Sequence, residues 1–400
     1  MVSKDQTSFN KRWTLGLLML GLVIVLWVLS SFLISLIFED DSYRKPFFIT
    51  YINTAAFIFY LFPTAKAIMG NYTATGHANV HRELIMEEEG TGGDASRIVD
   101  ANSPLLTNLE AGTQGTQKPR LTLYETIKLS AEFCILWFTA NLVTNASLAF
   151  TSVASQTILS TTSSFFTLFI GALCHVESLS RSKILGSFIS FIGIIMVTRT
   201  DSRQRYKTGI ADISGDNNDI SGDDNDTVQL LLGNLLALAG AVLYGVYSTL
   251  LKREVGDETR VNMKIFFGFV GLFNLLFLWP SLIVLNFFGW EPFELPKDPK
   301  VIIIILLNCL ITFVSDFCWA KAMLLTSPLT VTVGLSITIP LAMFGDVLFK
   351  HKTMPVLYLF GAALILGSFF IINKSSEEEH FENSVTTSTY EAMEQPVANN

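Results

Sequence analysis

The chain has 400 residues, of which half are hydrophobic and only 16% are charged, and its mean hydropathy is +0.45. This composition excludes a soluble globular chain of two or three domains and is typical of a polytopic membrane protein. The formal net charge of −8 comes largely from polar loops and the tail and does not resemble a basic nucleic-acid-binding surface, so no nucleic-acid partner is expected.

Ten apolar stretches follow one another along the chain, most of them close to the ~20 residues that a helix needs to cross a bilayer. They cover approximately residues 13–38, 47–69, 127–149, 153–174, 183–199, 230–251, 265–289, 301–325, 329–349 and 355–372. The first is too long for the core of a signal peptide and is expected to remain as a signal anchor. The sequence therefore predicts an all-α polytopic membrane protein with ten transmembrane helices in a lipid bilayer.

Three segments are too polar for the membrane. Residues 71–120 are rich in Gly, Thr and acids without helical periodicity, which predicts a disordered loop. Residues 200–229 contain the acidic run SGDNNDISGDDND and predict a second loop, and residues 373–400 predict a disordered tail. Connections on the side of the N-terminus, residues 1–12, carry the larger share of Lys and Arg. The positive-inside rule then predicts a cytosolic N-terminus, 71–120 loop and tail, with the 200–229 loop in the lumen.

The stretch from Asn141 to Gly171 contains no charge, yet hydroxyl and amide side chains crowd it. A polar side chain in hydrocarbon is costly unless it faces protein or a water-filled cavity. Ser and Thr bond back to their own helix and let helices approach closely, which explains the longer amides less well. Helix packing and a solute cavity are thus equal alternatives for this stretch. The candidate cavity residues in it are Asn141, Asn145, Gln156, Thr157 and Ser160.

The two halves of the membrane region, residues 13–199 and 230–372, share features. A shift of 175 residues places Thr151-Ser152 on Thr326-Ser327, Gly186 on Gly361 and Asn141 on Asp316. Each half has five predicted spans, and an odd number of crossings turns the second half upside down. We therefore expect an inverted repeat with a binding site near the midplane, between the halves.

The run ASLAFTSVASQTILSTTSSFFTLFIGAL, followed by HVESLSRSKILGSFISFIGIIMV, resembles the drug/metabolite transporter superfamily, and in it solute carrier family 35, subfamily F. The resemblance covers nearly the whole chain outside its loops and tail. It implies two inverted repeats of five helices and alternating access. Glu177 stands where the first repeat of this superfamily often has an acid, whereas Lys352 takes the equivalent place in the second repeat. The motifs indicate the fold better than the substrate, because members of the subfamily differ in cargo.

Charges inside the membrane are the next candidates. Lys128 and Glu132 are spaced i,i+4 and are expected to pair, as are Asp346 and Lys350. Asp316 instead lies well inside the span at 301–325 without such a partner. We favour a functional role for Asp316, as a group that binds a basic solute or couples transport to protons.

Further candidates surround Asp316. Tyr244 and Tyr247 flank a stripe of small residues in the span at 230–251, and Trp319 follows Asp316 by one turn and is suited to stack on a planar or cationic solute. Aromatic core packing is the alternative for all three. Lys321 is the one central base available for a phosphate. A neutral or cationic cargo therefore ranks above a nucleotide sugar.

Enzyme motifs are absent from the sequence, and its five histidines lack metal-ligand spacing, so neither an enzyme nor a cofactor nor a metal site is expected. The predicted function is transport of a small polar organic solute, which is nucleoside-like, cationic and vitamin- or drug-like, or nucleotide-sugar-like. The alternative is a non-transporting membrane scaffold or receptor. A homodimer is the expected oligomer if the chain self-associates.

Short motifs bear on location. Asn225-Asp-Thr227 is a glycosylation sequon in the predicted luminal loop, so Asn225 is the expected glycosylation site. Leu105 and Leu106 follow Asp100 nearly as in acidic dileucine sorting signals, although the acid is one residue too distant, and Tyr390 begins a tyrosine-based signal. Sorting adaptors are thus expected partners. With the family resemblance, these motifs favour the vacuolar or lysosomal membrane over the Golgi.

Overall fold

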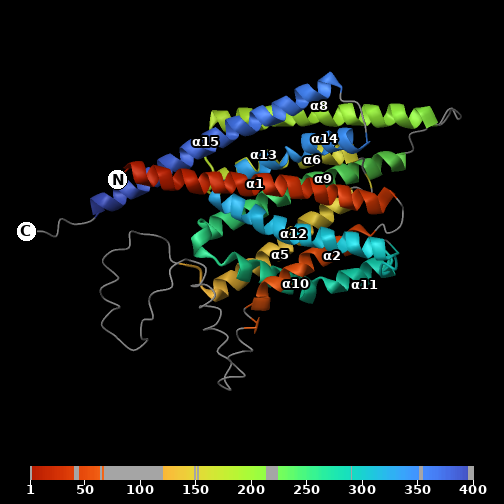
Figure 1. The fold of residues 1–400 in the computed structure, drawn as a ribbon, viewed down its shortest axis with the longest axis horizontal. Helices are drawn as coiled ribbons and strands as arrows, with labels where there is room; N and C mark the ends of the chain where they lie inside the picture. Colours follow the sequence, from red (N-terminus) through yellow and green to blue (C-terminus); the bar gives the residue numbers. More distant parts are fainter. Residues whose placement is uncertain are drawn as a thin grey trace, which may run out of the picture.

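The computed structural model describes residues 2–39, 45–63, 65–66, 120–147, 150, 153–212, 224–289, 291–350 and 355–394, and every regular element in them is a helix (Figure 1). In chain order the helices are α1 (Val2–Glu39), α2 (Pro46–Ala55), η1 (Ala56–Leu61), α5 (Leu123–Ser147), α6 (Val153–Ser160), α7 (Ser163–Leu173), α8 (Arg181–Asp212), α9 (Asp224–Val255), η3 (Glu258–Arg260), α10 (Met263–Phe277), α11 (Trp279–Phe287), α12 (Pro299–Leu325), α13 (Pro328–Leu335), α14 (Thr338–Lys350) and α15 (Val356–Glu394).

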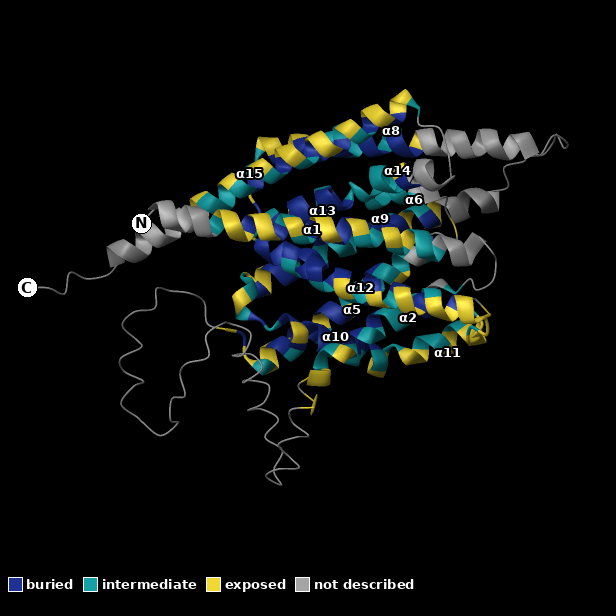
Figure 2. Ribbon diagram, in the orientation of Figure 1, coloured by how far each residue is buried: buried dark blue, intermediate teal, exposed yellow. Residues whose placement is uncertain are grey.

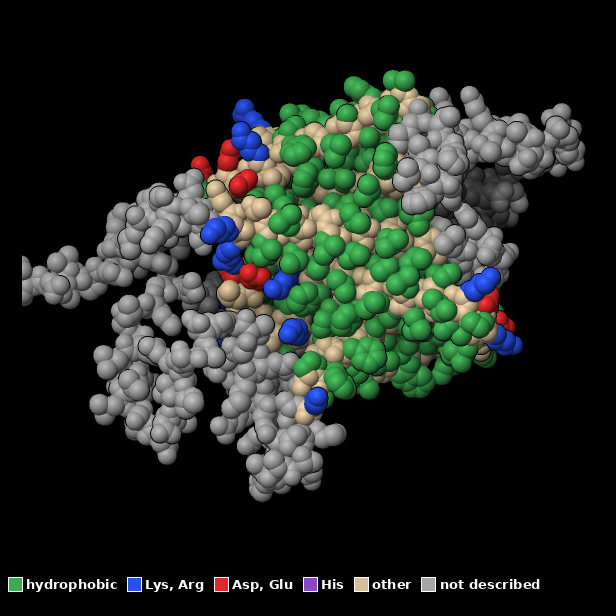
Figure 3. Space-filling model, in the orientation of Figure 1, with side chains coloured by type: hydrophobic (Ala, Val, Ile, Leu, Met, Phe, Trp, Pro, Cys, Tyr) green, Lys and Arg blue, Asp and Glu red, His purple; other side chains and the backbone are tan. Residues whose placement is uncertain are grey.

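Length and composition fit these helices to a bilayer. Among the described residues, seven segments are long and apolar enough to cross a membrane, and they lie in α1, α5, α8, α9, α10 with α11, α12 and α15. Figure 3 shows hydrophobic side chains over the middle of the bundle, with acidic and basic side chains gathered near its ends. The chain is therefore a polytopic all-α membrane protein, as its composition predicts.

Some helices are interrupted. α6 ends at Ser160 before α7 begins at Ser163, and α13 ends at Leu335 before α14 begins at Thr338. Hydroxyls bond back to the helix at both places, since Thr162 Oγ1 donates to the Leu159 carbonyl at 2.5 Å and Thr338 Oγ1 to the Leu335 carbonyl at 2.6 Å. Such bonds compete with the backbone ladder and bend helices.

Close helix pairs hold the bundle together: α8 with α15, α1 with α12, α5 with α9, and η1 with α10. In the α8–α15 seam the backbones touch. A Cβ added to Gly193 would lie 2.8 Å from the Gly361 carbonyl oxygen, and one added to Gly361 would lie 2.9 Å from the Gly193 oxygen. Small residues permit this approach, which gives van der Waals contact where lipid supplies no hydrophobic driving force between helices.

The two ends of the bundle differ in packing. We call the end where α1 begins and α15 ends the terminal end, and the opposite end, where α1 ends and α2 begins, the far end (Figure 1). A buried aromatic cluster that includes Phe133, Tyr247 and Trp319 fills the bundle toward the terminal end. In Figure 2 the buried residues gather where α5, α12 and α13 meet, and exposed residues face outward.

The polar segments differ in part from expectation. The acidic 200–229 loop was expected to be disordered, but α8 continues to Asp212 and α9 begins at Asp224. The tail from residue 373 was also expected to be disordered, but α15 continues to Glu394. The reason is cooperativity: a membrane-spanning helix supplies the nucleus, and each further turn propagates at little cost. The 71–120 loop lies outside the described residues, apart from Arg120.

Candidate functional site

A cavity of about 550 Å³ lies between the two halves of the chain. Its walls come from α1, α2, α5, α6, α9, α12 and α13, together with the breaks between α6 and α7 and between α13 and α14. On α1 and α5 the lining residues lie in the second half of each helix, which leads to the far end, and α2, which begins at the far end, contributes Thr50, Asn53 and Thr54. The cavity therefore extends from the middle of the bundle toward the far end.

Asp316 supplies the charge of the cavity. It is 4% exposed, and the Trp27 side chain of α1 lies against its carboxylate. The described residues that line the cavity include no Lys and no Arg. Because a buried carboxylate without a basic partner is costly when ionised, Asp316 needs a proton, water or a cationic solute beside it.

Asn141 lines the same cavity from α5, so the two residues that the sequence shift places on each other do meet at one site. Its amide nitrogen donates to the Trp137 carbonyl at 2.8 Å, which leaves the amide oxygen to the cavity. Gln156 donates to Ser160 Oγ at 2.9 Å, and Thr157 lies beside them in the lining. Both alternatives for this stretch thus apply, because the side chains bond within their helices while facing the cavity.

Aromatic side chains surround the carboxylate. Tyr244 and Tyr247 line the cavity from α9, and Trp27 and Trp137 line it from α1 and α5. These rings present flat faces and polar tips, which suit an amphipathic organic solute and attract cations. Burial of the carboxylate among rings favours a solute with a delocalised or shielded positive charge over a compact, strongly hydrated ion.

Two predicted site residues with described side chains, Trp319 and Lys321, are not among the residues that line the cavity. Trp319 is fully buried in the aromatic cluster, a position that favours core packing, the alternative given for it above. Lys321 points toward the terminal end, where its Nζ lies 3.6 Å from Glu258 and 5.7 Å from the Phe317 ring centre, because its place on α12 turns it away from Asp316. The side chain of Asn145 lies outside the described residues, although its backbone belongs to α5.

Lys128 and Glu132 form the expected pair at 3.7 Å, and Asp346 and Lys350 have no described side chains.

Other lining residues escaped the sequence reasoning. Among them are Trp27, Ser30, Ser31, Thr50, Asn53, Thr54, Trp137, Thr144, Thr312, Thr332, Ser336 and Thr338. The Asn53 carboxamide oxygen is buried and has no hydrogen-bond partner among the described residues, so it is available to a solute donor. Thr312 stands one turn before Asp316, a signal that was readable. The sequence contains no such signal for Trp27 and Trp137, because a tryptophan within an apolar run looks the same as a residue of the hydrophobic core.

The interrupted helices meet this cavity. The α6–α7 break occurs at Thr161-Thr162 and the α13–α14 break at Ser336-Ile337, which a shift of 175 residues superposes. Thr161 and Ser336 both line the cavity. Broken helices at bilayer depth are tolerated where they line a cavity, and they commonly form the binding sites of secondary transporters.

Comparisons with known proteins agree with this picture. No protein-family model matches the chain. The chain is 86% identical over 400 residues, the full length of both proteins, to an uncharacterized vacuolar membrane protein of Saccharomyces cerevisiae. It is 38% identical over 91% of its length to a thiamine-repressible mitochondrial transport protein of the same yeast, covering 92% of that protein. It is also 30% identical over 91% of its length to solute carrier family 35 member F5 of Pongo abelii, covering 77% of that protein.

A solved structure gives the fold independently. The chain aligns with a crystal structure at a TM-score of 0.56 and 14% identity, covering 90% of this chain and 98% of that one. At this identity the likeness concerns the fold alone.

Proposed function

The chain belongs to the solute carrier family 35 transporters related to member F5, and from that premise we propose that it moves a small polar organic solute, neutral or cationic, by alternating access. It is a membrane transporter with several membrane-spanning helices, located in the vacuolar membrane. The observation that carries the proposal is the cavity between the halves, with Asp316 as its charge and broken helices in its wall.

The side chains that line the cavity favour some classes of substrate over others. A nucleotide sugar brings phosphates, which proteins meet with Arg and Lys, and the described lining has neither. Lys321, the base that the sequence offered, is paired with Glu258 outside the cavity. A cationic solute would instead neutralise Asp316 and place its rings on the surrounding aromatic faces, while the amides and hydroxyls accept or donate hydrogen bonds. We therefore rank organic cations first, neutral nucleoside-like solutes second and nucleotide sugars last.

Ten spans in two inverted repeats are part of the proposal. The starts of α5, α6, α7 and α8, at Leu123, Val153, Ser163 and Arg181, correspond to those of α12, α13, α14 and α15 at Pro299, Pro328, Thr338 and Val356, after a shift of 175 or 176 residues. Packing supports the same symmetry: α1 with α12 mirrors α9 with α5, and α8 packs on its own counterpart, α15.

In the α8–α15 seam the symmetry holds for individual residue contacts. A Cβ on Gly186 would lie 3.5 Å from the Ser368 carbonyl oxygen, and one on Gly361 would lie 2.9 Å from that of Gly193. The shift of 175 residues turns the first contact into the second. A contact set that maps onto itself in this way is what a two-fold axis produces.

In alternating access, Asp316 would bind the solute and a proton in turn. A carboxylate at bilayer depth is stabilised by a cationic solute in the loaded state and by a proton in the empty state. Solute and proton would compete for the same oxygens, so release of one is coupled to binding of the other. The empty carrier can then return without a buried, unpaired charge.

Flux per folded molecule tests the function. Purified protein is first screened by thermal shift against organic cations, nucleosides and nucleotide sugars, and compounds that raise the melting temperature are then tested for uptake into proteoliposomes. Asp316→Asn should fold normally, since Asn fills the matching place at Asn141, and should lower cation flux by about 100-fold or more, as expected when a buried ionic contact is lost. Glu132→Gln, which removes a carboxylate from the surface pair with Lys128, serves as the matched control. Normal flux per folded molecule in Asp316→Asn would contradict the role of Asp316. Absence of uptake of every shifting compound by the wild type would favour the scaffold or receptor.

Orientation and targeting remain proposals with direct tests. We place the terminal end in the cytosol, so that Asn225, in the first turn of α9, faces the lumen. Glycosidase treatment should shift the wild-type band and leave Asn225→Gln unshifted, and sugar on Asn71 would reverse the orientation. Of the sorting motifs, Leu105 and Leu106 lie outside the described residues, and Tyr390 falls in α15 without a described side chain. Alanine at these three positions should misdirect a fluorescent fusion.

A further inference from the structure

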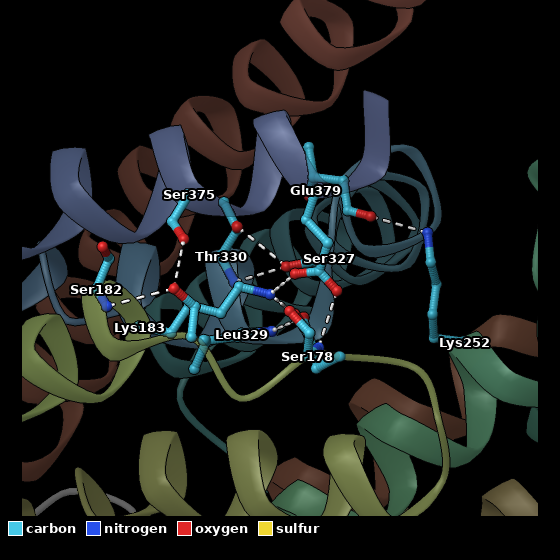
Figure 4. A network of polar contacts seen from close by, with 12 residues as sticks. Ser178, Ser182, Lys183, Lys252, Ser327, Leu329, Thr330, Ser375 and Glu379 are labelled. Carbon is cyan, nitrogen blue, oxygen red and sulfur yellow. Dashed lines mark hydrogen bonds and ion pairs between the residues drawn. The ribbon is translucent and has the colours of Figure 1, made fainter. Parts of the chain in front are cut away.

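Three charged side chains form a buried group at the terminal end (Figure 4). Lys183 of α8 donates to Glu177 Oε2 at 2.6 Å and pairs with Glu379 of α15. The side chains of Lys183 and Glu177 are 0% exposed, and that of Glu379 is 20% exposed. Glu379 also accepts a hydrogen bond from the Ser178 backbone N–H at 2.9 Å. Charges are buried at a high desolvation cost, so a fully partnered group of this kind requires an explanation.

Glu177 extends this group to the second half of the chain. Its Oε1 accepts the backbone N–H of Leu329 at 3.2 Å, in the first turn of α13. A carboxylate at a helix N-terminus satisfies an unpaired N–H and complements the helix dipole. Lys252 of α9 acts on the preceding helix, because its Nζ donates to the carbonyls of Leu324 at 2.6 Å and Thr326 at 2.8 Å, at the end of α12. The turn between α12 and α13 is thus held by an anion on its amides and a cation on its carbonyls.

This turn connects the charged group to the cavity. α12 carries Asp316, and α13 runs from the turn to the break at Ser336 that lines the cavity. A displacement of the turn away from α8 therefore moves both cavity walls together. On the terminal side of the cavity lie the buried aromatic cluster with Trp319 and the charged group.

The contacts divide by the half from which each partner comes. Lys183 and Glu177 both belong to the first half, so their pair persists when the halves separate. The contact of Glu177 with Leu329 joins the first half to the second, and the contacts of Glu379 with Lys183 and Ser178 join the first half to the extension of α15, which continues the last helix of the second half. Breaking them leaves Lys183 and Glu177 mutually neutralised and moves Glu379, which is already partly exposed, toward water. Opening therefore leaves no charge both buried and unpaired. It avoids the desolvation penalty that an unpaired buried charge would impose.

We propose that Glu177, Lys183 and Glu379 form a latch that keeps the terminal side of the cavity closed, and that the extension of α15 beyond the membrane is its movable part. The inference rests on the proposed transport function, because a latch of this kind serves alternating access. Each cross-half contact stabilises the state closed at the terminal end relative to the state open there. The extension of α15 is therefore part of the gate, and whatever draws Glu379 from Lys183 shifts the carrier toward opening at that end.

Thiol accessibility tests the latch without knowledge of the solute. Ser336→Cys places a thiol in the cavity, in a background in which Cys134, Cys174, Cys309 and Cys318 are replaced by alanine. Intact vacuoles receive a membrane-impermeant maleimide, and a cysteine at the exposed position Lys374 reports which face the reagent reaches. Glu379→Gln should raise the labelling rate of Ser336→Cys from the terminal side by about tenfold, as expected when a closed-state contact is lost. Glu378→Gln is the matched control, because its carboxylate contacts the exposed Lys374 at 3.9 Å.

A second variant guards against misfolding. The combination of Glu177→Gln, Lys183→Met and Glu379→Gln removes all three charges, so that none is left buried and unpaired, and it should also label faster. Labelling at the wild-type rate in both Glu379→Gln and the triple variant, with folded protein, would overturn the latch. Faster labelling in these variants together with absent flux of every tested solute would support the latch as a gate while contradicting the proposed transport function.

Discussion

The two ends of the bundle use the same interaction in different surroundings. At the far end, Glu291 accepts the backbone N–H groups of Phe47 at 3.0 Å and Phe48 at 2.9 Å, at the start of α2. At the terminal end, Glu177 accepts the N–H of Leu329, at the start of α13. In both cases a carboxylate from one half of the chain caps a helix of the other half. Each is therefore a reciprocal tie between the halves.

What differs is how the carboxylate is supported. Glu177 is fully buried with Lys183 and Glu379, whereas Glu291 is part-exposed and its neighbour Lys45 contacts the Pro292 carbonyl and, at 3.9 Å, the exposed Glu294. Buried charges hold strongly once assembled, and exposed ones hold weakly because water competes for them. The terminal end is therefore held by a buried group of charges and the far end by partly exposed contacts, the asymmetry that the proposed alternating access requires of a state closed at the terminal end.

The largest expected effect comes from removing the cation of the buried group at the terminal end. Lys183→Met leaves Glu177 buried without its partner, so we expect a loss of about 3–5 kcal/mol in stability. Lys128→Met, on the same end but in the exposed pair with Glu132, should cost about 0–1 kcal/mol. Melting temperatures in detergent measure both variants. Equal losses would mean that burial does not strengthen the charged contacts of the terminal end, which is the basis of its contrast with the far end.

The next comparison uses the two ends of one helix. Ser327 is the N-cap of α13 at the terminal end, where it is fully buried and its Oγ accepts the Thr330 N–H at 3.2 Å. Ser336 follows the same helix at the cavity. Ser327→Ala should cost about 1 kcal/mol, within the 0.5–2 kcal/mol of lost helix caps, and Ser336→Ala at most about 0.5 kcal/mol. A larger loss at Ser336 would mean that the cavity wall is packed rather than solvated.

More residues of the cavity than of the charged group at the terminal end were predictable from the sequence. Asn141, Gln156 and Asp316 are polar groups at bilayer depth. The free-energy cost of burying such groups in the membrane is enough to identify them as candidate site residues from the sequence. Seven of the ten predicted solute-site residues line the cavity: Asn141, Gln156, Thr157, Ser160, Tyr244, Tyr247 and Asp316. Trp319 and Lys321 lie outside the cavity lining, because periodicity tells which residues share a helix face and not which helix stands opposite.

The latch was not predictable in the same way. Glu177 was singled out only by family resemblance, and Lys183 and Glu379 sit at the polar ends of spans, where charges are ordinary. Their meeting depends on how α8 and α15 cross and on the continuation of α15 past residue 373, which composition argued against. Composition predicted the all-α membrane architecture because length and apolarity are local, whereas this contact joins residues 196 positions apart.

A third test concerns the far end. Glu291→Gln keeps the side-chain shape but removes the charge that complements the N-terminus of α2, so a loss of about 0.3–1 kcal/mol is expected. Glu294→Gln, which affects a side chain 73% exposed, should be neutral within about 0.5 kcal/mol. Because α2 supplies part of the cavity wall, Glu291→Gln should also speed labelling of Ser336→Cys from the far side. A loss as large as that of Lys183→Met would show that the far end is held as strongly as the terminal end.

The smallest effect belongs to an exposed tie at the terminal end, and it is read through pH. Arg12 of α1 contacts Asp257 at 2.8 Å, with both side chains nearly half exposed. Partial burial alone would raise the pKa of Asp257, but the hydrogen bonds from Thr259 and Arg12 outweigh it and hold that pKa below its ordinary value. A lowered pKa in the folded state adds stability above the ordinary value of about 3.9, and this stability is lost as the pH falls through the folded pKa. Asp257→Asn keeps the cap on Thr259, since Asn caps as well as Asp, and removes the charge contact with Arg12. Its melting temperature should therefore lie slightly below that of the wild type at pH 7, by the equivalent of less than about 1 kcal/mol, and the two should converge only as the pH falls through the lowered folded pKa of Asp257, below about 3.9. A difference that persists unchanged at low pH would mean that packing, and not charge, ties α1 to this end.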